Sequence, residues 1–148
     1  MQTLQIYDFL PSRPIVVDPR VVLTMLGERA IRASWQVAGV ARYNEAFMIT
    51  GDEAADRLEA LSESQSRISG ALLIQLVHEV VQVIWGEFRA CEEGKDAPWV
   101  VVRAIDSSWC EVETDDEKVL NCVRRTFVDV RTALLGKLAR PGSAVCKT

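Results

Sequence analysis

Two copies of one short motif constrain the fold of this chain more than any other feature. Residues 50–53 (TGDE) and 114–117 (TDDE) both fit the T-x-x-E capping box, in which the Thr hydroxyl accepts a free N–H of the first helical turn and the Glu reaches back to the Thr N–H. Each box follows a tryptophan, Trp35 or Trp99, at the same interval, and two strand-like segments lie within each interval. The pattern therefore predicts two ββα units, each with a helix capped by its Thr.

The rest of the chain is predicted to form further strands and helices joined by short polar connections. We expect strands at residues 32–41, 45–49, 81–91, 98–105 and 109–113, and helices at residues 18–26, 51–63, 69–80 and 115–126. The competing interpretation of the first helix is a strand through residues 21–23. Because hairpins dominate this order, we predict an α+β fold with a mainly antiparallel sheet of about five strands and three to four helices.

The length of 148 residues favours one domain. We expect a single α+β domain over residues 1–135, followed by a loosely ordered tail over 136–148, which contains Gly, Pro and Lys. Whether the two ββα units are a true duplication stays open, because Leu61 of the first helix corresponds to the charged Arg125 of the second.

The four cysteines, Cys91, Cys110, Cys122 and Cys146, form no C-x-x-C pair, and the chain has one histidine. This pattern does not indicate a metal site. Cys91 and Cys110 could be neighbours on adjacent strands, but reduced thiols in a cytoplasmic protein are the simpler interpretation. We therefore expect folding without metal, cofactor or disulfide. The N-terminal residues do not resemble a signal peptide, and residues 68–85 are too polar to span a bilayer, so no membrane association is predicted.

The net charge of −4 disfavours nucleic acid as a partner, because phosphate binding needs a basic surface. The charges are unevenly distributed: residues 92–117 contain nine acidic residues against Lys95 and Arg103, whereas residues 118–148 contain seven basic residues against Asp129. Such an asymmetry can mark a partner surface. The helix dipole offers a second explanation, because it favours acids before a helix and bases at its end.

No motif indicates a specific reaction. His78 could act as a general base, but Glu79, the next residue on the same helix, points elsewhere and cannot orient it. The acidic cluster around the last strand includes Glu111 and Glu113, which share a strand face and could hold Mg²⁺ or Ca²⁺, although a solvated face is the commoner meaning of such a pair.

Tryptophan is abundant, and the four indoles are expected to play two different roles. Trp35, Trp85 and Trp99 lie in strongly apolar strand-like segments and are predicted to be core residues, whereas Trp109 follows a turn, alternates with acids and could be exposed.

These observations favour a non-catalytic binding or protein-interaction module over an enzyme. The apolar residues at 81–85 and 99–102 would occupy both faces of their strands, so we expect a homodimer that covers the second face, or a protein partner such as a basic enzyme inhibited by this acidic chain. A helix within residues 1–30 could cover that face instead. The alternative is a small-ligand-binding protein or enzyme with a pocket between sheet and helices. Its candidate ligand-binding residues are Trp109, Glu111, Asp106 and His78.

Overall fold

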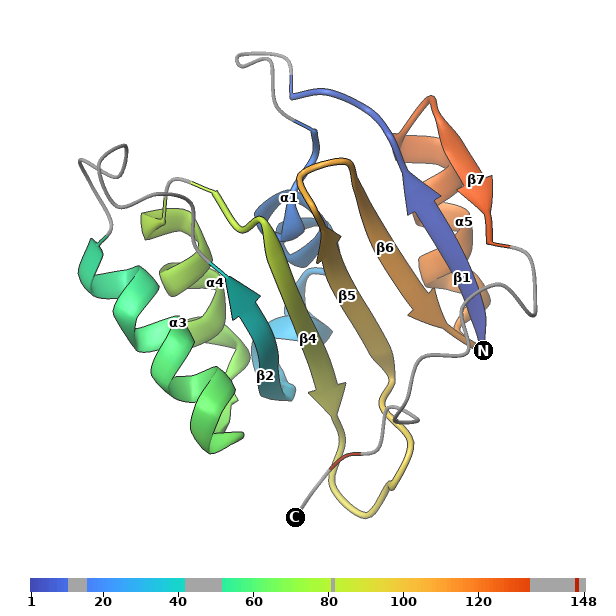
Figure 1. Cartoon of the computed structure of the whole chain (residues 1–148). Coiled ribbons are helices and arrows are strands. Elements are labelled where there is room, and N and C mark those ends of the chain that lie inside the picture. Colours follow the sequence, from blue (N-terminus) through green and yellow to red (C-terminus); the bar gives the residue numbers. More distant parts are fainter. Residues whose placement is uncertain (11–15, 42–51, 81, 134–145, 147–148) are drawn as a thin grey trace.

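A computed structural model describes residues 1–10, 16–41, 52–80, 82–133 and 146 (Figure 1). Within these ranges, seven strands form one antiparallel sheet in the order β3-β2-β4-β5-β6-β1-β7, accompanied by five helices. In chain order the elements are β1 (Gln2–Ile6), α1 (Pro19–Met25), α2 (Glu28–Arg32), β2 (Ser34–Ala41), α3 (Asp52–Ser64), β3 (Arg67–Ser69), α4 (Gly70–Glu79), β4 (Trp85–Cys91), β5 (Val100–Ile105), β6 (Trp109–Thr114), α5 (Glu117–Thr126) and β7 (Val130–Thr132). The α+β class and the antiparallel sheet are confirmed, but the predicted five strands and three to four helices were too few.

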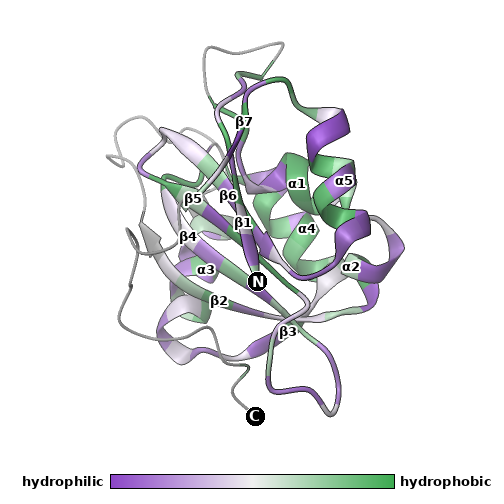
Figure 2. Ribbon diagram, turned by 90° about the vertical axis from the view of Figure 1, so that its right-hand side faces the viewer, coloured by the Kyte–Doolittle hydropathy of each residue, from purple (hydrophilic) through white to green (hydrophobic). Residues whose placement is uncertain are grey.

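The helices leave one face of the sheet open. Figure 1 shows α1 behind β5 and α5 behind β1, and Figure 2 shows α1, α4 and α5 together on one side of the strands. The core lies between these layers, where Leu23 of α1 and Leu76 of α4 belong to one buried cluster with Val100, Val102 and Ala104 of β5. No described helix covers the opposite side of β4, β5 and β6, which we call the open face.

Local capping explains why two helices begin where the sequence predicts. Asp18 accepts a hydrogen bond from the Arg20 N–H at 3.1 Å, Pro19 follows at the first helical position, and Gly27, with φ of +69°, turns the chain into α2. Ser69 Oγ likewise accepts from the Leu72 N–H at 3.2 Å to start α4. The helical interpretation of residues 18–26 is therefore confirmed.

The capping box at residues 114–117 does not work as predicted. Thr114 is the last residue of β6 and is fully buried, and its hydroxyl donates to the Trp99 carbonyl at 2.6 Å and accepts from the Asp116 N–H at 3.0 Å. The N-cap of α5 is instead Asp116, whose carboxylate accepts from the Lys118 N–H at 2.9 Å. Thr114 therefore ends β6 and does not cap α5. The N-cap of α5 lies two residues later than the capping box predicts.

Only one of the two ββα units is found as predicted. β5, β6 and α5 form the second unit. In the first, β2 pairs with β3 and β4, and both Thr50 and the expected strand at 45–49 lie outside the described residues. β1, β3, β7 and α2 were not predicted, and β4 begins at Trp85 rather than at residue 81.

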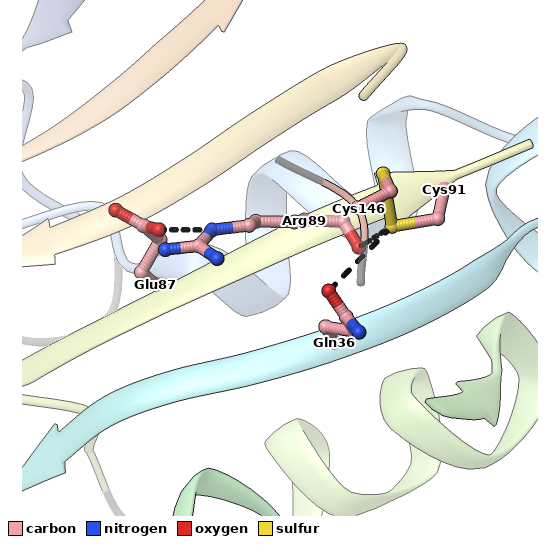
Figure 3. Close-up of a disulfide and its surroundings, with 5 residues drawn as sticks. All are labelled: Gln36, Glu87, Arg89, Cys91 and Cys146. Atoms are coloured by element: carbon pink, nitrogen blue, oxygen red, sulfur yellow. Dashed lines mark hydrogen bonds and ion pairs between the residues drawn. A yellow bond between two sulfur atoms is a disulfide. The ribbon is translucent and has the colours of Figure 1, made fainter. Parts of the chain in front are cut away.

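The prediction that all cysteines are reduced is wrong. Cys91, at the end of β4, is disulfide-bonded to Cys146, with their Cα atoms 5.7 Å apart (Figure 3). Cys110 is a buried free thiol on β6, and β5 separates it from Cys91. Of the predicted loose tail, only Cys146 is described, and its N–H donates to the Asp96 carbonyl at 2.9 Å. The division into a domain and a tail stays a prediction.

Gly70 lies where α4 meets the end of α2, and we expect Gly70→Ala to lower the free energy of unfolding by about 1–3 kcal/mol. A Cβ at this position would lie 1.8 Å from the Ala30 carbonyl oxygen, so the backbones would have to separate. Ala71→Ser, at the exposed next position, should change stability by less than about 0.5 kcal/mol. Urea denaturation measures both, and a Gly70→Ala variant more stable than wild type would contradict this close packing.

Candidate functional site

The open face is built by strand alternation. Along β4, Phe88 and Ala90 are buried in the core, while Trp85, Glu87 and Arg89 project from the other side. The antiparallel register then places the open-face residues of neighbouring strands in rows across the sheet. One row, which we call the charged row, runs through Glu87, Arg103, Glu111 and Gln5.

Arg103 is the centre of the charged row and is only 8% exposed. Its guanidinium donates to Glu87 at 2.6 Å and to Glu113, diagonally across the ladder, at 2.7 Å, and lies 3.7 Å from Glu111. Glu87 also pairs with Arg89 (Figure 3). A buried guanidinium is tolerated only when its charge and its N–H groups are paired, and here carboxylates on both adjacent strands pair them.

The same contacts shift the pKa values of the two central partners. Burial alone would raise the pKa of Glu87, but its hydrogen bonds and ion pairs with Arg103 and Arg89 outweigh burial and hold that pKa below the usual range. Burial would lower the pKa of Arg103, but Glu87 and Glu113 raise it instead. Both groups are therefore held in their charged forms.

A second row beside the first is aromatic and apolar. Ile105 of β5 pairs with Trp109 of β6. Trp85 of β4 lies opposite Ile105 when the β4–β5 register is continued by one pair. Tyr7 stacks on Trp109, with the ring centroids 5.7 Å apart. The Arg131 guanidinium covers the Tyr7 ring, 3.9 Å from its centroid. We call Trp85, Ile105, Trp109 and Tyr7 the aromatic row. Trp85 is 43% exposed, so the row ends in a large apolar surface open to solvent.

The two rows are joined through Glu111, which is 1% exposed. Its Oε1 accepts from the Trp109 indole N–H at 3.0 Å and from the Gln5 amide at 3.3 Å. The Tyr7 hydroxyl lies 3.3 Å from the Gln5 side-chain oxygen and donates to it. Trp109 and Tyr7 of the aromatic row are thus held in place by hydrogen bonds to side chains of the charged row. This part of the surface is pre-organised for binding.

The structure brings together two of the four residues proposed for a ligand site. Trp109 and Glu111 are hydrogen-bonded on the open face. Asp106 is exposed in the β5–β6 turn, where its φ is +47°. His78 is exposed on α4, in the helical layer, with Nδ1 2.7 Å from the Ile74 carbonyl oxygen. These four side chains therefore do not converge on a pocket.

The tryptophan predictions have mixed outcomes. Trp35 is fully buried and its indole N–H donates to the Ala30 carbonyl at 2.8 Å, as expected of a core residue. Trp99 is half-buried against the core, and its indole donates to Asp116 at 2.9 Å under the guanidinium of Arg29. Trp85 was wrongly assigned to the core, because β4 begins at this residue and it projects from the open face.

The acidic cluster does not form a metal site in the described part of the chain, where no group of three or more metal-ligating side chains gathers. Glu111 and Glu113 do share a face, as predicted, but Arg103 lies between them. Among the open hollows that described residues line, one of about 660 Å³ lies between α2 and the end of β4, and one of about 370 Å³ lies along α5. Neither hollow is lined by a residue of the charged row or of the aromatic row.

Comparison with protein families, curated proteins and solved structures finds no match for this chain. The described helices are all too short or too polar to cross a bilayer.

Proposed function

We propose that the chain is a non-catalytic protein-interaction module that binds its partner through the aromatic row of the open face. The observation that carries this proposal is the exposure of Trp85, 43%, at the end of a row whose other aromatic members are fixed by stacking and hydrogen bonds. Tryptophan, tyrosine and arginine dominate the binding energy of protein interfaces. An aromatic row with Arg131 packed over its Tyr7 ring has this composition.

The partner we propose first is a second copy of the chain. The reason for a dimer that the sequence offers is the presence of apolar side chains on both faces at residues 81–85 and 99–102. It no longer applies, because β4 begins at Trp85, and Val100, Val101 and Val102 are already fully buried within one chain. The support now comes from the sheet face that none of the described helices covers. A two-fold interface would place the same aromatic row on both sides and remove the exposed indole from water.

Light scattering at micromolar concentration tests the dimer, for which the expected mass is twice the 16.5 kDa of one chain. Trp85→Ser should raise the dimer dissociation constant by about 30-fold or more, the size of an interface hot spot of about 2 kcal/mol. Ile31→Ser is the matched control, since Ile31 is 40% exposed on α2, away from the open face, and the dimer should persist. A wild-type mass of one chain over a wide dilution range would refute the dimer, and equal loss in both variants would refute the role of the aromatic row.

The predicted cytoplasmic location remains part of this proposal, and the disulfide is the observation against it. Thioredoxin and glutathione keep most cytosolic thiols reduced, whereas a disulfide persists in oxidising compartments. Alkylation of the thiols in acid-quenched cells distinguishes the two: four modified cysteines per chain indicate a reducing compartment, and two indicate an oxidising one.

A further inference from the structure

The outer surface of α5 differs in charge from the rest of the described molecule. Most of the described arginines and lysines pair with a carboxylate, among them Arg20, Arg29, Arg32, Arg89, Lys95, Arg103 and Arg131. By contrast, the side chains of Lys118, Arg124 and Arg125 are exposed on α5 and form no hydrogen bond or ion pair with any described residue.

The helix dipole accounts for only part of this surface. Arg124 and Arg125 lie in the last turn of α5, where cations are favoured. Lys118 lies in the first turn, where the positive end of the dipole disfavours a cation. The stability of α5 therefore does not explain a lysine at this position. A contact with another molecule would explain it.

Lys118 and Arg125 are aligned along the helix. They stand at i and i+7 with Asn121 and Cys122 between them, and together with Thr126 these residues line the hollow of about 370 Å³. No acidic side chain lines the hollow. At 1.5 Å per residue, the two cations start about 10 Å apart along the helix axis.

We infer that this face of α5 binds a short acidic segment of a partner protein, with carboxylates about 10 Å apart that pair with Lys118 and Arg125. This is close to the distance between residues three apart in a polyproline II segment, which rises about 3.1 Å per residue and has three residues per turn, so both carboxylates project from the same side. Asn121 supplies an amide to hydrogen-bond the segment between the two charges. A long polyanion fits less well, because Asp115, Asp116 and Glu117 lie at one end of the face and the chain carries a net charge of −4.

This docking surface is separate from the open face. α5 lies in the helical layer behind the sheet, on the far side from the aromatic row (Figure 1). A partner segment on α5 would therefore leave the proposed dimer interface free, and failure of either proposal leaves the other intact.

Fluorescence anisotropy with a short synthetic peptide that carries Glu at every third position tests the inference, with the same peptide carrying Gln as the negative probe. We expect the Glu peptide to bind, and to bind more weakly as salt is raised toward physiological ionic strength, where the Debye length is about 8 Å. Arg125→Glu should weaken binding about tenfold or more. Arg57→Glu makes the same charge change at an exposed position of α3 and should leave affinity within about twofold.

Four results of the binding measurements would overturn the inference. These are no binding of the Glu peptide at low salt, equal binding of the Gln peptide, equal loss in Arg125→Glu and Arg57→Glu, and tighter Arg125-dependent binding of a single-stranded oligonucleotide than of the peptide. Self-association that Arg125→Glu abolishes and Trp85→Ser does not would make a second copy the occupant of α5 and would also overturn it. Unchanged thermal midpoints establish that both variants fold.

Discussion

Cys146→Ser is expected to lower the free energy of unfolding by about 4 kcal/mol, the largest single loss that the structure predicts outside the charged row. The disulfide joins residues 55 positions apart, so its removal returns the loop-closure entropy of a long loop to the unfolded chain. Both cysteines are buried, with Cys91 1% and Cys146 5% exposed, so the replacement of either one adds a small packing cost.

Urea denaturation with and without a reductant provides the measurement. The wild-type protein in reductant should unfold at the midpoint of Cys146→Ser, and the variant should not respond to reductant. Cys122→Ser is the matched control, since Cys122 is a half-buried free thiol on α5 and its loss should cost less than about 0.5 kcal/mol. If the oxidised wild-type protein and Cys146→Ser unfold at the same midpoint, the bond contributes nothing and the earlier expectation of a fold independent of disulfides is restored.

Local signals in the sequence were sufficient to predict the helices that carry their own caps. Asp18 and Ser69 are followed directly by helix-compatible residues, and their side chains accept the N–H groups that a new helix leaves free. The sequence around Thr114 also looks like a helix start. Asp116, however, is a stronger cap two residues later, and the Thr114 hydroxyl donates to the Trp99 carbonyl of the adjacent loop. The better acceptor and a tertiary contact together thus decided which side chain caps α5.

The strand order could not be predicted, because it depends on pairing between distant segments. Residues 2–6 do alternate, with Leu4 and Ile6 buried, but nothing in so short a segment indicates that it inserts between β6 and β7. β3 and β7 have three residues each, too few for a periodic signal. The pairing of Cys91 with Cys146 is equally non-local.

The candidate site was predicted in part for the same reason. Trp109 and Glu111 alternate along one strand, so their common face could be inferred from β6 alone. Arg103 carried a signal that went unused: it is the only charged residue of β5, in a strand where every other side chain is apolar. A lone arginine in such a strand requires carboxylates on the neighbouring strands, and Glu87 and Glu113 meet this requirement.

Arg103→Met is expected to destabilise the protein by about 3–5 kcal/mol, the cost of removing one partner from a buried ion pair. Methionine fills a similar volume, so the loss should come from the charges: Glu87 and Glu113 would keep their carboxylates on a crowded sheet face without the central cation. Arg131→Met is the matched control, because Arg131 is 59% exposed, pairs with Asp129, and should cost less than about 1 kcal/mol. Replacing Arg103, Glu87 and Glu113 together by apolar residues should recover only part of the loss. It removes three charges from the sheet face, but Arg89 then loses Glu87 and the buried Glu111 loses Arg103.

The pH dependence separates this electrostatic cost from a loss of packing. The pKa of Glu87 is lower in the folded state than in the unfolded state, so its contribution to stability is present above the usual glutamate range and is lost as pH falls through the folded pKa. Without Arg103, the pKa of Glu87 should rise and the carboxyl should protonate at higher pH, which relieves the unpaired charge. The difference in unfolding free energy between wild type and Arg103→Met should therefore be largest near neutral pH and should shrink as the pH is lowered through the glutamate range. Urea denaturation at a series of pH values measures it, and a difference that does not change with pH would mean that the side chain of Arg103 stabilises the sheet by packing, without a contribution from its charge.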